Sequence, residues 1–92
     1  VTALWLGSQG GQLGVVEALL AAKADVNAAR TTDGSTPLHM ASQKGHLDIV
    51  KTLLHAGADP HRLSTPHPLT PLDVAVHLGH TDIATLLRAH RP

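Results

Sequence analysis

The sequence predicts an all-α repeat solenoid, in which short helix-turn-helix units stack within one domain and are joined by hairpin-like loops. The tetrapeptide TPLH, which begins at Thr36, returns as TPLD at Thr70, a shift of 34 residues. A fixed period of this length is typical of stacked repeats. Trp5 is the only residue among Phe, Tyr and Trp, so the core must consist of aliphatic side chains. Pro and Gly stand where short helices would begin and end.

The composition argues against several classes of partner. Seven Lys and Arg balance seven Asp and Glu over 92 residues, so the chain lacks the positive charge by which proteins recognise nucleic acids. No apolar run approaches the roughly 20 residues that span a bilayer. There is no cysteine, which suits a reducing compartment. We therefore expect an intracellular domain with no nucleic acid and no membrane as partner.

Each copy of the repeat is predicted to contain two helices, most clearly in the second copy. Thr36 can cap a helix that begins at Pro37, and Gly45 can end it in the left-handed conformation. The first helix should therefore cover residues 37–44. The second should cover residues 47–56, because apolar residues recur there on one helical face.

The same shift of 34 residues divides the single domain into three copies. These cover residues 1–27, which lack an opening loop, then residues 28–61 and residues 62–92. Between the helix pairs lie residues 25–35 and 59–69, which are rich in Asp, Thr, Ser, Pro and Gly. This composition predicts extended turns or hairpins rather than helix.

The segment TPLHMASQKGHLDIVKTLLHAGAD, from Thr36 to Asp59, resembles an ankyrin repeat, and the resemblance covers nearly the whole chain. It implies stacked helix pairs that bind a partner protein or peptide, in another molecule or within the same parent chain, without enzymatic activity. Each connecting loop is one residue longer than the usual period of about 33 residues allows. Trp5 stands where the second copy has His39, so the loop contacts of the first copy are expected to differ.

The third copy differs from the second at an interface position. Arg88 stands where the second copy has Leu54, and an apolar stacking position that becomes cationic indicates a face in water. The copy is similar to the C-terminal capping repeats of the family, so we expect the stack to end near His90. In the alternative, the arginine snorkels from an interface that is still packed.

The first copy opens with Leu4 and Trp5 and presents no polar face. This pattern resembles an internal repeat and favours further repeats upstream. We expect a monomer in which Leu4 and Trp5 are exposed and can drive self-association through this end. In the alternative, Trp5 covers the end of the core as a lid.

Eight histidines suggest a metal-site hypothesis, which their positions do not favour. His39, His46 and His80 fall where the ankyrin pattern carries His, and the resemblance implies hydrogen bonds between loop and helix. His77 and His80 are three residues apart, but Gly79 ends the helix between them. We expect no metal site and no cofactor, and a stability that responds to pH near about 6 to 7. No nucleophile beside a base and no paired carboxylates are visible, so no catalytic residue is expected.

Asn27 is a candidate site of modification. Leu19 lies eight residues before it and Asp25-Val26 directly precede it, which resembles the target pattern of asparaginyl hydroxylases in ankyrin loops. In the alternative, Asn27 is an ordinary turn residue, a role that Asn commonly takes.

Partner contacts are expected at positions that differ between copies, because repeated positions serve packing. Along the first helices these positions change from polar to apolar, as in a peptide groove with a few apolar anchors. The alternative function is a structural C-terminal end or spacer of a longer ankyrin array, with no ligand of its own. The candidate contact residues are Gln9, Gln43, Lys44, His77 and Leu78 on the first helices, and Arg30, Thr31, Asp33, Ser35, Leu63 and Leu69 in the loops.

Overall fold

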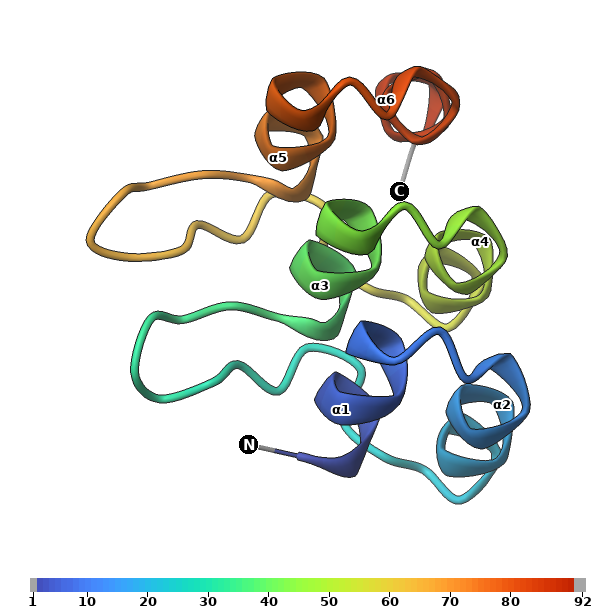
Figure 1. Ribbon diagram of the computed structural model, residues 1–92. Helices are drawn as coiled ribbons and strands as arrows, with labels where there is room; N and C mark the ends of the chain where they lie inside the picture. The colour runs from blue at the N-terminus through green and yellow to red at the C-terminus, as the bar shows by residue number, and fades with distance from the viewer. Residues whose placement is uncertain (1, 91–92) are drawn as a thin grey trace.

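A computed structural model describes residues 2–90, in which six helices form three stacked pairs (Figure 1). Helices α1, α3 and α5 contact one another in order and form the first layer, while α2, α4 and α6 form the second. This arrangement confirms the predicted all-α repeat solenoid. The helices are α1 (Ala3–Gln9), α2 (Leu13–Ala21), α3 (Pro37–Lys44), α4 (Leu47–His55), α5 (Pro71–Leu78) and α6 (Thr81–Ala89).

The first helix of every pair begins at a threonine cap. The side-chain oxygens of Thr2, Thr36 and Thr70 each accept a hydrogen bond from the backbone N–H three residues later, at distances of 3.1, 3.3 and 3.1 Å. Such a cap satisfies a backbone donor that has no partner inside the helix and contributes about 1 kcal/mol. Gly45 ends α3 with φ of 76°, a left-handed conformation that glycine adopts without steric penalty. The predicted range of 37–44 is therefore confirmed.

Helix α4 ends one residue earlier than expected. The prediction extended it to Ala56, which instead caps the helix and donates its backbone N–H to Thr52 and Leu53 carbonyls at 3.1 Å. Gly57 follows with φ of 91°. The chain therefore turns away at Gly57 after a shared, bifurcated hydrogen bond, a common ending for a helix.

The core lies between the two layers of helices. Its centre consists of aliphatic side chains from all three pairs, and each contributes about 1.5 to 3 kcal/mol by leaving water. No Phe or Tyr is needed because the small side chains let the helices approach closely. The fully buried aliphatic residues of this core include Leu4, Val16, Leu38, Ile49, Val50, Leu53 and Ile83.

The expectation that Leu4 and Trp5 are exposed is wrong. Only 2 % of Leu4 and 3 % of Trp5 are accessible to solvent. Leu4 belongs to the common core, and the guanidinium carbon of Arg30 lies 4.5 Å from the centre of the Trp5 ring. The argument for self-association through these two residues therefore fails, because the first connecting loop supplies the cover that the sequence alone did not reveal.

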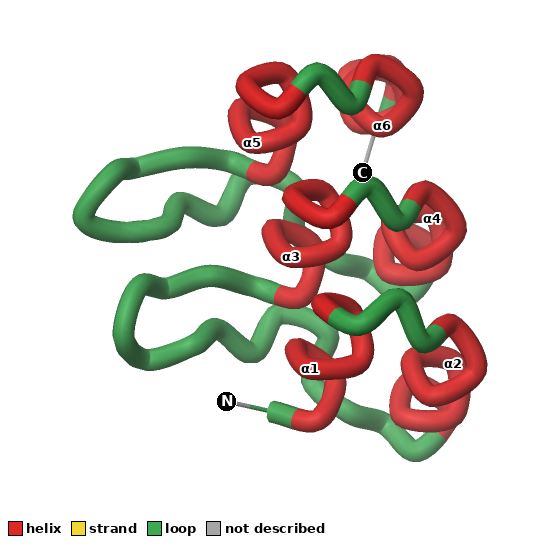
Figure 2. The backbone as a smooth tube through the Cα atoms, in the orientation of Figure 1, coloured by secondary structure: helices red, strands yellow, loops and turns green. Residues whose placement is uncertain are grey.

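The two connecting segments project beside the first-layer helices as hairpin-like loops (Figure 2). In the first, the Arg30 N–H donates to the Ser35 carbonyl at 2.7 Å, and in the second the Ser64 N–H donates to the Leu69 carbonyl at 3.0 Å. The described residues contain no strand. The loops thus have the predicted hairpin character, and they stand next to each other along one edge of the stack.

Within residues 2–90, no helix has both the length and the apolar character required to cross a membrane.

Candidate interaction site

His39 joins the second repeat to the loop that follows it. Its Nδ1 accepts a hydrogen bond from the Thr36 backbone N–H at 3.1 Å, and its Nε2 lies 2.7 Å from the Leu69 carbonyl oxygen. Because Nδ1 accepts, the proton must be on Nε2, which donates to Leu69. The ring is therefore a neutral Nε2–H tautomer that completes the cap of α3 and holds the second loop.

Burial lowers the pKa of His39, because removing the ring from water disfavours its charged form. The Leu69 carbonyl and the Asp33 carboxylate act in the opposite direction, but with smaller effect. The neutral tautomer required by the hydrogen bonds is therefore also the form that burial favours.

Two other histidines bridge consecutive repeats. The Nε2 atom of His46 lies 3.3 Å from the Gln9 carbonyl oxygen, and that of His80 lies 3.1 Å from the Gln43 carbonyl oxygen. Each ring thus meets the end of a first-layer helix in the preceding repeat, where carbonyl groups lack helical partners. The predicted structural role of His39, His46 and His80 is confirmed.

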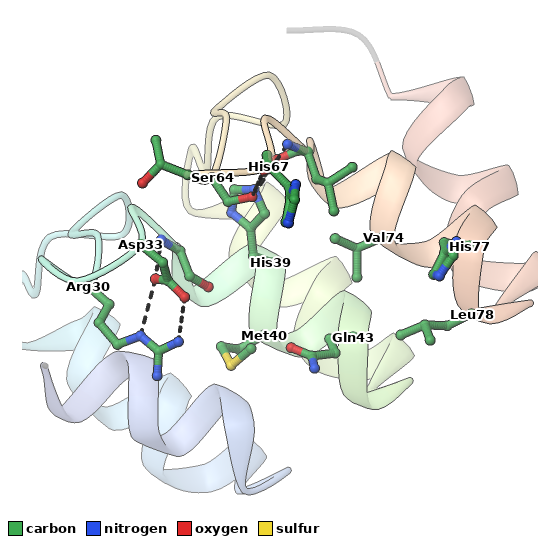
Figure 3. A pocket seen from close by; sticks show the side chains of 13 residues that line it. Arg30, Asp33, His39, Met40, Gln43, Ser64, His67, Val74, His77 and Leu78 are labelled. Atoms are coloured by element: carbon green, nitrogen blue, oxygen red, sulfur yellow. Dashed lines mark hydrogen bonds and ion pairs between the residues drawn. The ribbon is translucent and has the colours of Figure 1, made fainter.

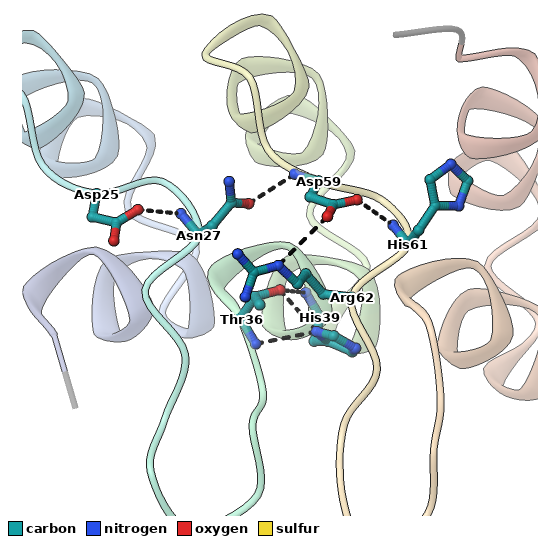
Figure 4. Close-up of polar contacts among 7 residues, drawn as sticks. All are labelled: Asp25, Asn27, Thr36, His39, Asp59, His61 and Arg62. Atoms are coloured by element: carbon teal, nitrogen blue, oxygen red, sulfur yellow. Dashed lines mark hydrogen bonds and ion pairs between the residues drawn. The ribbon is translucent and has the colours of Figure 1, made fainter.

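Asn27 also links two repeats (Figure 4). Its Oδ1 accepts the Asp59 backbone N–H at 2.7 Å, and its own N–H donates to Asp25 Oδ1 at 3.0 Å. Asp59 in turn accepts the His61 N–H at 2.9 Å and lies 3.5 Å from Arg62 Nε. The side chain of Asn27 therefore makes a contact between repeats, its amide oxygen is already engaged, and the local turn bond comes from the Asp25 side chain.

Arg30 and Asp33 form an ion pair in the first loop (Figure 3). Arg30 Nε donates to Asp33 Oδ1 at 3.1 Å, and its Nη2 donates to Oδ2. The Arg30 guanidinium holds the pKa of Asp33 below its ordinary value, and the Ser35 N–H adds to this effect. The hydrogen bond to Asp33 likewise raises the pKa of Arg30. This pairing fixes both side chains on one side of the loop.

A groove of about 360 Å³ lies between the two loops and helices α3 and α5 (Figure 3). Its lining combines apolar side chains with imidazole, amide and hydroxyl groups, and the Thr65 N–H joins the two loops by donating to the Asp33 carbonyl at 2.6 Å. The lining residues are Arg30, Asp33, Ser35, His39, Met40, Gln43, Ser64, Thr65, His67, Leu69, Val74, His77 and Leu78.

The groove brings together many, but not all, of the predicted contact residues. Those that line it are Arg30, Asp33, Ser35, Gln43, Leu69, His77 and Leu78. Those that do not are Gln9, Thr31, Lys44 and Leu63.

One of the lining residues was misplaced by the sequence analysis. Ser35 was expected on a loop tip, but only 4 % of it is accessible. It immediately precedes the Thr36 cap, which itself is buried. Ser35 therefore contributes to the wall of the groove more than to its open surface.

The sequence analysis missed the apolar floor of the groove, which is formed by Met40 and Val74. They occupy equivalent positions in successive repeats, and Leu6 is their counterpart in the first. Three different side chains at one position are the same signal that selected the other candidates. Applied to this position, the comparison of the three copies would have identified Met40 and Val74 as candidate contact residues.

Within residues 2–90, no group of three or more His, Asp or Glu side chains is arranged to hold a metal ion. Three titratable groups at the groove are instead paired with one another or bonded to backbone atoms, namely Arg30, Asp33 and His39.

Stacked helix pairs with projecting loops and a groove between them define a helical repeat protein with a surface suited to binding. The family model for ankyrin repeats matches residues 4–91 in three copies, and the chain belongs to the ankyrin repeat family. Ankyrin repeats generally act as protein-protein interaction modules and are generally not enzymes. A comparison with curated proteins gave no match to this chain.

Proposed function

We propose that this chain binds a segment of a partner protein in the groove between the two loops and helices α3 and α5. The observation that carries the proposal is the convergence of predicted contact residues from two repeats on one hollow of about 360 Å³. Sites for small ligands and side chains are typically hollows of about 300 to 1,000 Å³ with apolar walls and a few polar groups. This groove has that composition.

The open side of the groove offers apolar anchoring surface. Leu78 is 47 % exposed and Leu69 is 38 % exposed, and Met40 and Val74 line the same groove. Burying a large aliphatic side chain is worth about 1.5 to 3 kcal/mol, and a few such contacts usually supply most of the affinity of an interface. A partner side chain that enters between these residues would therefore act as the main anchor.

The alternative proposal is a structural spacer or C-terminal end of a longer array, with no ligand of its own. A spacer has no need to present Leu63, Leu69 and Leu78 to solvent, yet all three are exposed. The binding proposal accounts for Leu69 and Leu78, which line the groove, and the spacer proposal does not. We further propose that the module works inside the cell and as a monomer, consistent with the absence of cysteine and the burial of Leu4 and Trp5.

A site-specific crosslinking experiment tests the proposal. A photoreactive amino acid is placed at Gln43, inside the groove, and in a matched protein at Lys51, which is exposed on α4. We expect the Gln43 protein to crosslink a cellular protein that the Lys51 protein does not, and we expect a Leu78→Ala variant to lose the crosslink. Circular dichroism checks that the variants remain helical. Equal crosslinking from both positions, or none from Gln43, would contradict binding in the groove and favour the spacer.

Hydroxylation of Asn27 stays a proposal of its own. The carbon that would be modified belongs to a side chain whose amide oxygen already accepts the Asp59 N–H, so a hydroxylase would need the loop to leave this contact. Mass spectrometry of the peptide isolated from cells tests it. A peptide population without added oxygen at Asn27 would contradict it.

A further inference from the structure

We propose that the contact between His39 and Leu69 is a pH-sensitive latch: the neutral ring holds the second loop against α3, and protonation of the ring releases the loop and opens the groove. This inference rests on the proposed function, because it concerns the regulation of the same site. It follows from the partners of the two ring nitrogens, from the burial of the ring, and from its place in the wall of the groove.

Both nitrogens of the His39 ring are engaged, and only the neutral ring fits the two partners. Nδ1 accepts the Thr36 N–H at 3.1 Å, and Nε2 donates to the Leu69 carbonyl at 2.7 Å. A charged imidazole carries a proton on each nitrogen, so its Nδ1–H would face the Thr36 N–H as donor against donor. The Thr36 hydroxyl, 2.8 Å from Nδ1, already accepts the His39 backbone N–H. Protonation therefore costs the bond from the Thr36 N–H.

The His39 ring is also shielded from water. Only 3 % of the residue is accessible, and this burial lowers its pKa, because the charged form needs hydration. The Leu69 carbonyl, the Asp33 carboxylate and the Arg62 backbone favour the charged form, but burial outweighs them. The charged ring becomes hydrated when it leaves the wall of the groove or when the loop beside it moves away. Either movement gives up the bond to Leu69.

The second loop can move away without losing its own structure. Its Ser64 N–H donates to the Leu69 carbonyl at 3.0 Å, and its Thr65 N–H donates to the Asp33 carbonyl of the first loop at 2.6 Å. These bonds do not involve His39, so the hairpin stays intact and its tip stays attached. Leu69 supplies apolar surface to the groove. Its displacement from α3 therefore removes an anchor for the partner.

The latch occurs in one repeat of the three. Trp5 and Asp73 occupy the position of His39 in the first and third repeats. Trp5 has no basic nitrogen, and the Asp73 carboxylate accepts the Thr70 N–H at 3.0 Å. Imidazole is the side chain whose ordinary pKa lies in the range between about pH 5 and 8. Of the three residues, His39 is also the one that lines the groove.

The other titratable groups around His39 do not replace it in this role. Arg30 and Asp33 pair with each other, and Arg62 lies 3.5 Å from Asp59. Helix α1 carries no titratable side chain, and those of α4 are exposed. The groups on the elements around the ring are Arg30 and Asp33 of the first loop, Asp59, Arg62 and His67 of the second, Asp73 and His77 of α5, and Lys44 of α3.

Proton linkage sets the size of the effect. A ring in the open loop titrates near the ordinary value of about 6.5, whereas the closed ring stays neutral to lower pH. Protonation then favours the open form by up to about 30-fold at about pH 5, and by a factor of about one at about pH 7.5. Mild acid therefore shifts the loop toward the open form before a partner is present.

A distance measurement between two spin labels tests the latch. The chain has no cysteine, so Pro68→Cys beside Leu69 and Lys51→Cys on α4 can be labelled specifically. Both positions are exposed, and neither lines the groove. We expect double electron-electron resonance to show a population at longer distance that is at least about threefold larger at about pH 5 than at about pH 7.5. Circular dichroism at both pH values checks that the helices remain.

Matched variants assign the movement to His39. In His39→Gln the side chain does not titrate, so the distances should be the same at both pH values. His55→Gln removes an exposed histidine outside the groove and should respond as the original protein does. Labels at Thr31→Cys and Lys51→Cys report the first loop, which should not move. The absence of a longer distance in acid, or the same lengthening in His39→Gln, would overturn the latch.

Crosslinking from Gln43 connects the latch to binding. The cellular protein captured there is purified and added back at about pH 7.5 and about pH 5. We expect the crosslink yield to fall at least about threefold in acid, and to change by less than half as much in His39→Gln. The two proposals fail separately. A loop that opens while Gln43 captures no protein would contradict groove binding alone, and a captured protein with an unmoved loop would contradict the latch alone.

Discussion

The imidazole of His39 reaches the carbonyl oxygen of Leu69, 30 residues further along the chain, at 2.7 Å from Nε2. Both residues also line the groove. The hydrogen bond therefore holds the second loop at a fixed distance from α3. The shape of the proposed binding site depends on this contact and on the Thr65 N–H that donates to the Asp33 carbonyl at 2.6 Å.

Replacing His39 by Ala should destabilise the protein more than the same change at the equivalent position of the third repeat. His39→Ala removes the side-chain half of the reciprocal cap of α3 and the bond to Leu69, and leaves the Thr36 N–H and the Leu69 carbonyl without these partners, at an expected cost of about 2 to 3 kcal/mol. Asp73→Ala removes only the exposed bond from the Thr70 N–H to the Asp73 carboxylate, for about 1 kcal/mol. Urea unfolding followed by circular dichroism measures both, and equal losses would contradict the bridging role.

The free energy of unfolding should decrease as the pH falls below about 6.5, the ordinary value for histidine. Because burial lowers the pKa of His39, the unfolded chain binds a proton at this residue before the native state does. The stabilisation that comes from keeping His39 neutral is therefore fully present above that pH and is lost as the pH falls below it. Urea unfolding at several pH values measures the decrease.

The His39→Gln variant is the control for this pH dependence. Glutamine can keep the reciprocal cap of α3 but does not titrate. We expect a flatter curve between about pH 7.5 and 5.5. An unchanged curve would assign the dependence to other histidines. A second decrease should occur at lower pH, because the pKa of Asp33 is lowered by Arg30 and its stabilisation is lost as the carboxylate becomes protonated.

Substitution of Gly11 should reveal how closely the repeats approach. A Cβ atom at Gly11 would lie 2.7 Å from Cε1 of His46, so Gly11→Ala must displace the ring that contacts the Gln9 carbonyl. Gly57 is the control, since it also has positive φ but no heavy atom lies within 4 Å of the added Cβ. We expect Gly57→Ala to cost about 1 kcal/mol and Gly11→Ala about 1 kcal/mol more. Thermal unfolding of both variants makes the comparison.

Ser42→Ala should stabilise the protein. The Ser42 hydroxyl is buried in α3 and has no hydrogen-bond partner within residues 2–90, a situation that costs free energy on folding. Alanine removes the hydroxyl and is a better helix former, for an expected gain of about 1 kcal/mol. Ser64→Ala is the contrast, because its hydroxyl donates to the His67 carbonyl at 2.8 Å. A loss of stability in Ser42→Ala would indicate a hydrogen bond to an ordered water.

Asn27→Ala should loosen the contact between the first two repeats. The change leaves the Asp59 N–H without its acceptor at 2.7 Å, for an expected loss of about 1 kcal/mol. Asn27→Asp keeps an acceptor oxygen and should lose less. Hydrogen exchange at the Asp59 amide reports the contact directly, and unchanged protection in Asn27→Ala would mean that the side chain does not hold this loop.

The repeat pattern allowed the helices to be predicted closely. Thr36 at the cap, Pro37 at the first position and Gly45 at the end each act on their immediate neighbours, so their effect can be read without knowing the fold. The structural role of His39, His46 and His80 was also predicted, because the ankyrin pattern that the chain resembles carries His at these positions. The end of α4 was misjudged by one residue, because Ala56 carries no signal that distinguishes the last turn of a helix from its cap.

The candidate site was predicted only in part. Gln43, His77 and Leu78 were found because they differ between copies on the face of the first helices. Met40 and Val74 carry the same signal, but the comparison of copies was not applied to their position. Trp5 was expected to be exposed because its cover, the guanidinium of Arg30 at 4.5 Å, comes from a loop whose path the sequence does not state.

The sequence by itself determined the period of 34 residues, the positions of the caps and the aliphatic character of the core. These depend on interactions within one repeat, which recur wherever the same residues recur. Only the tertiary structure decided that Asp33 meets Arg30 beside the groove, that Trp5 is buried, and that His39 reaches Leu69. The reason is physical: loop conformation and the stacking distance between repeats result from the packing of many side chains at once, and no single residue encodes them.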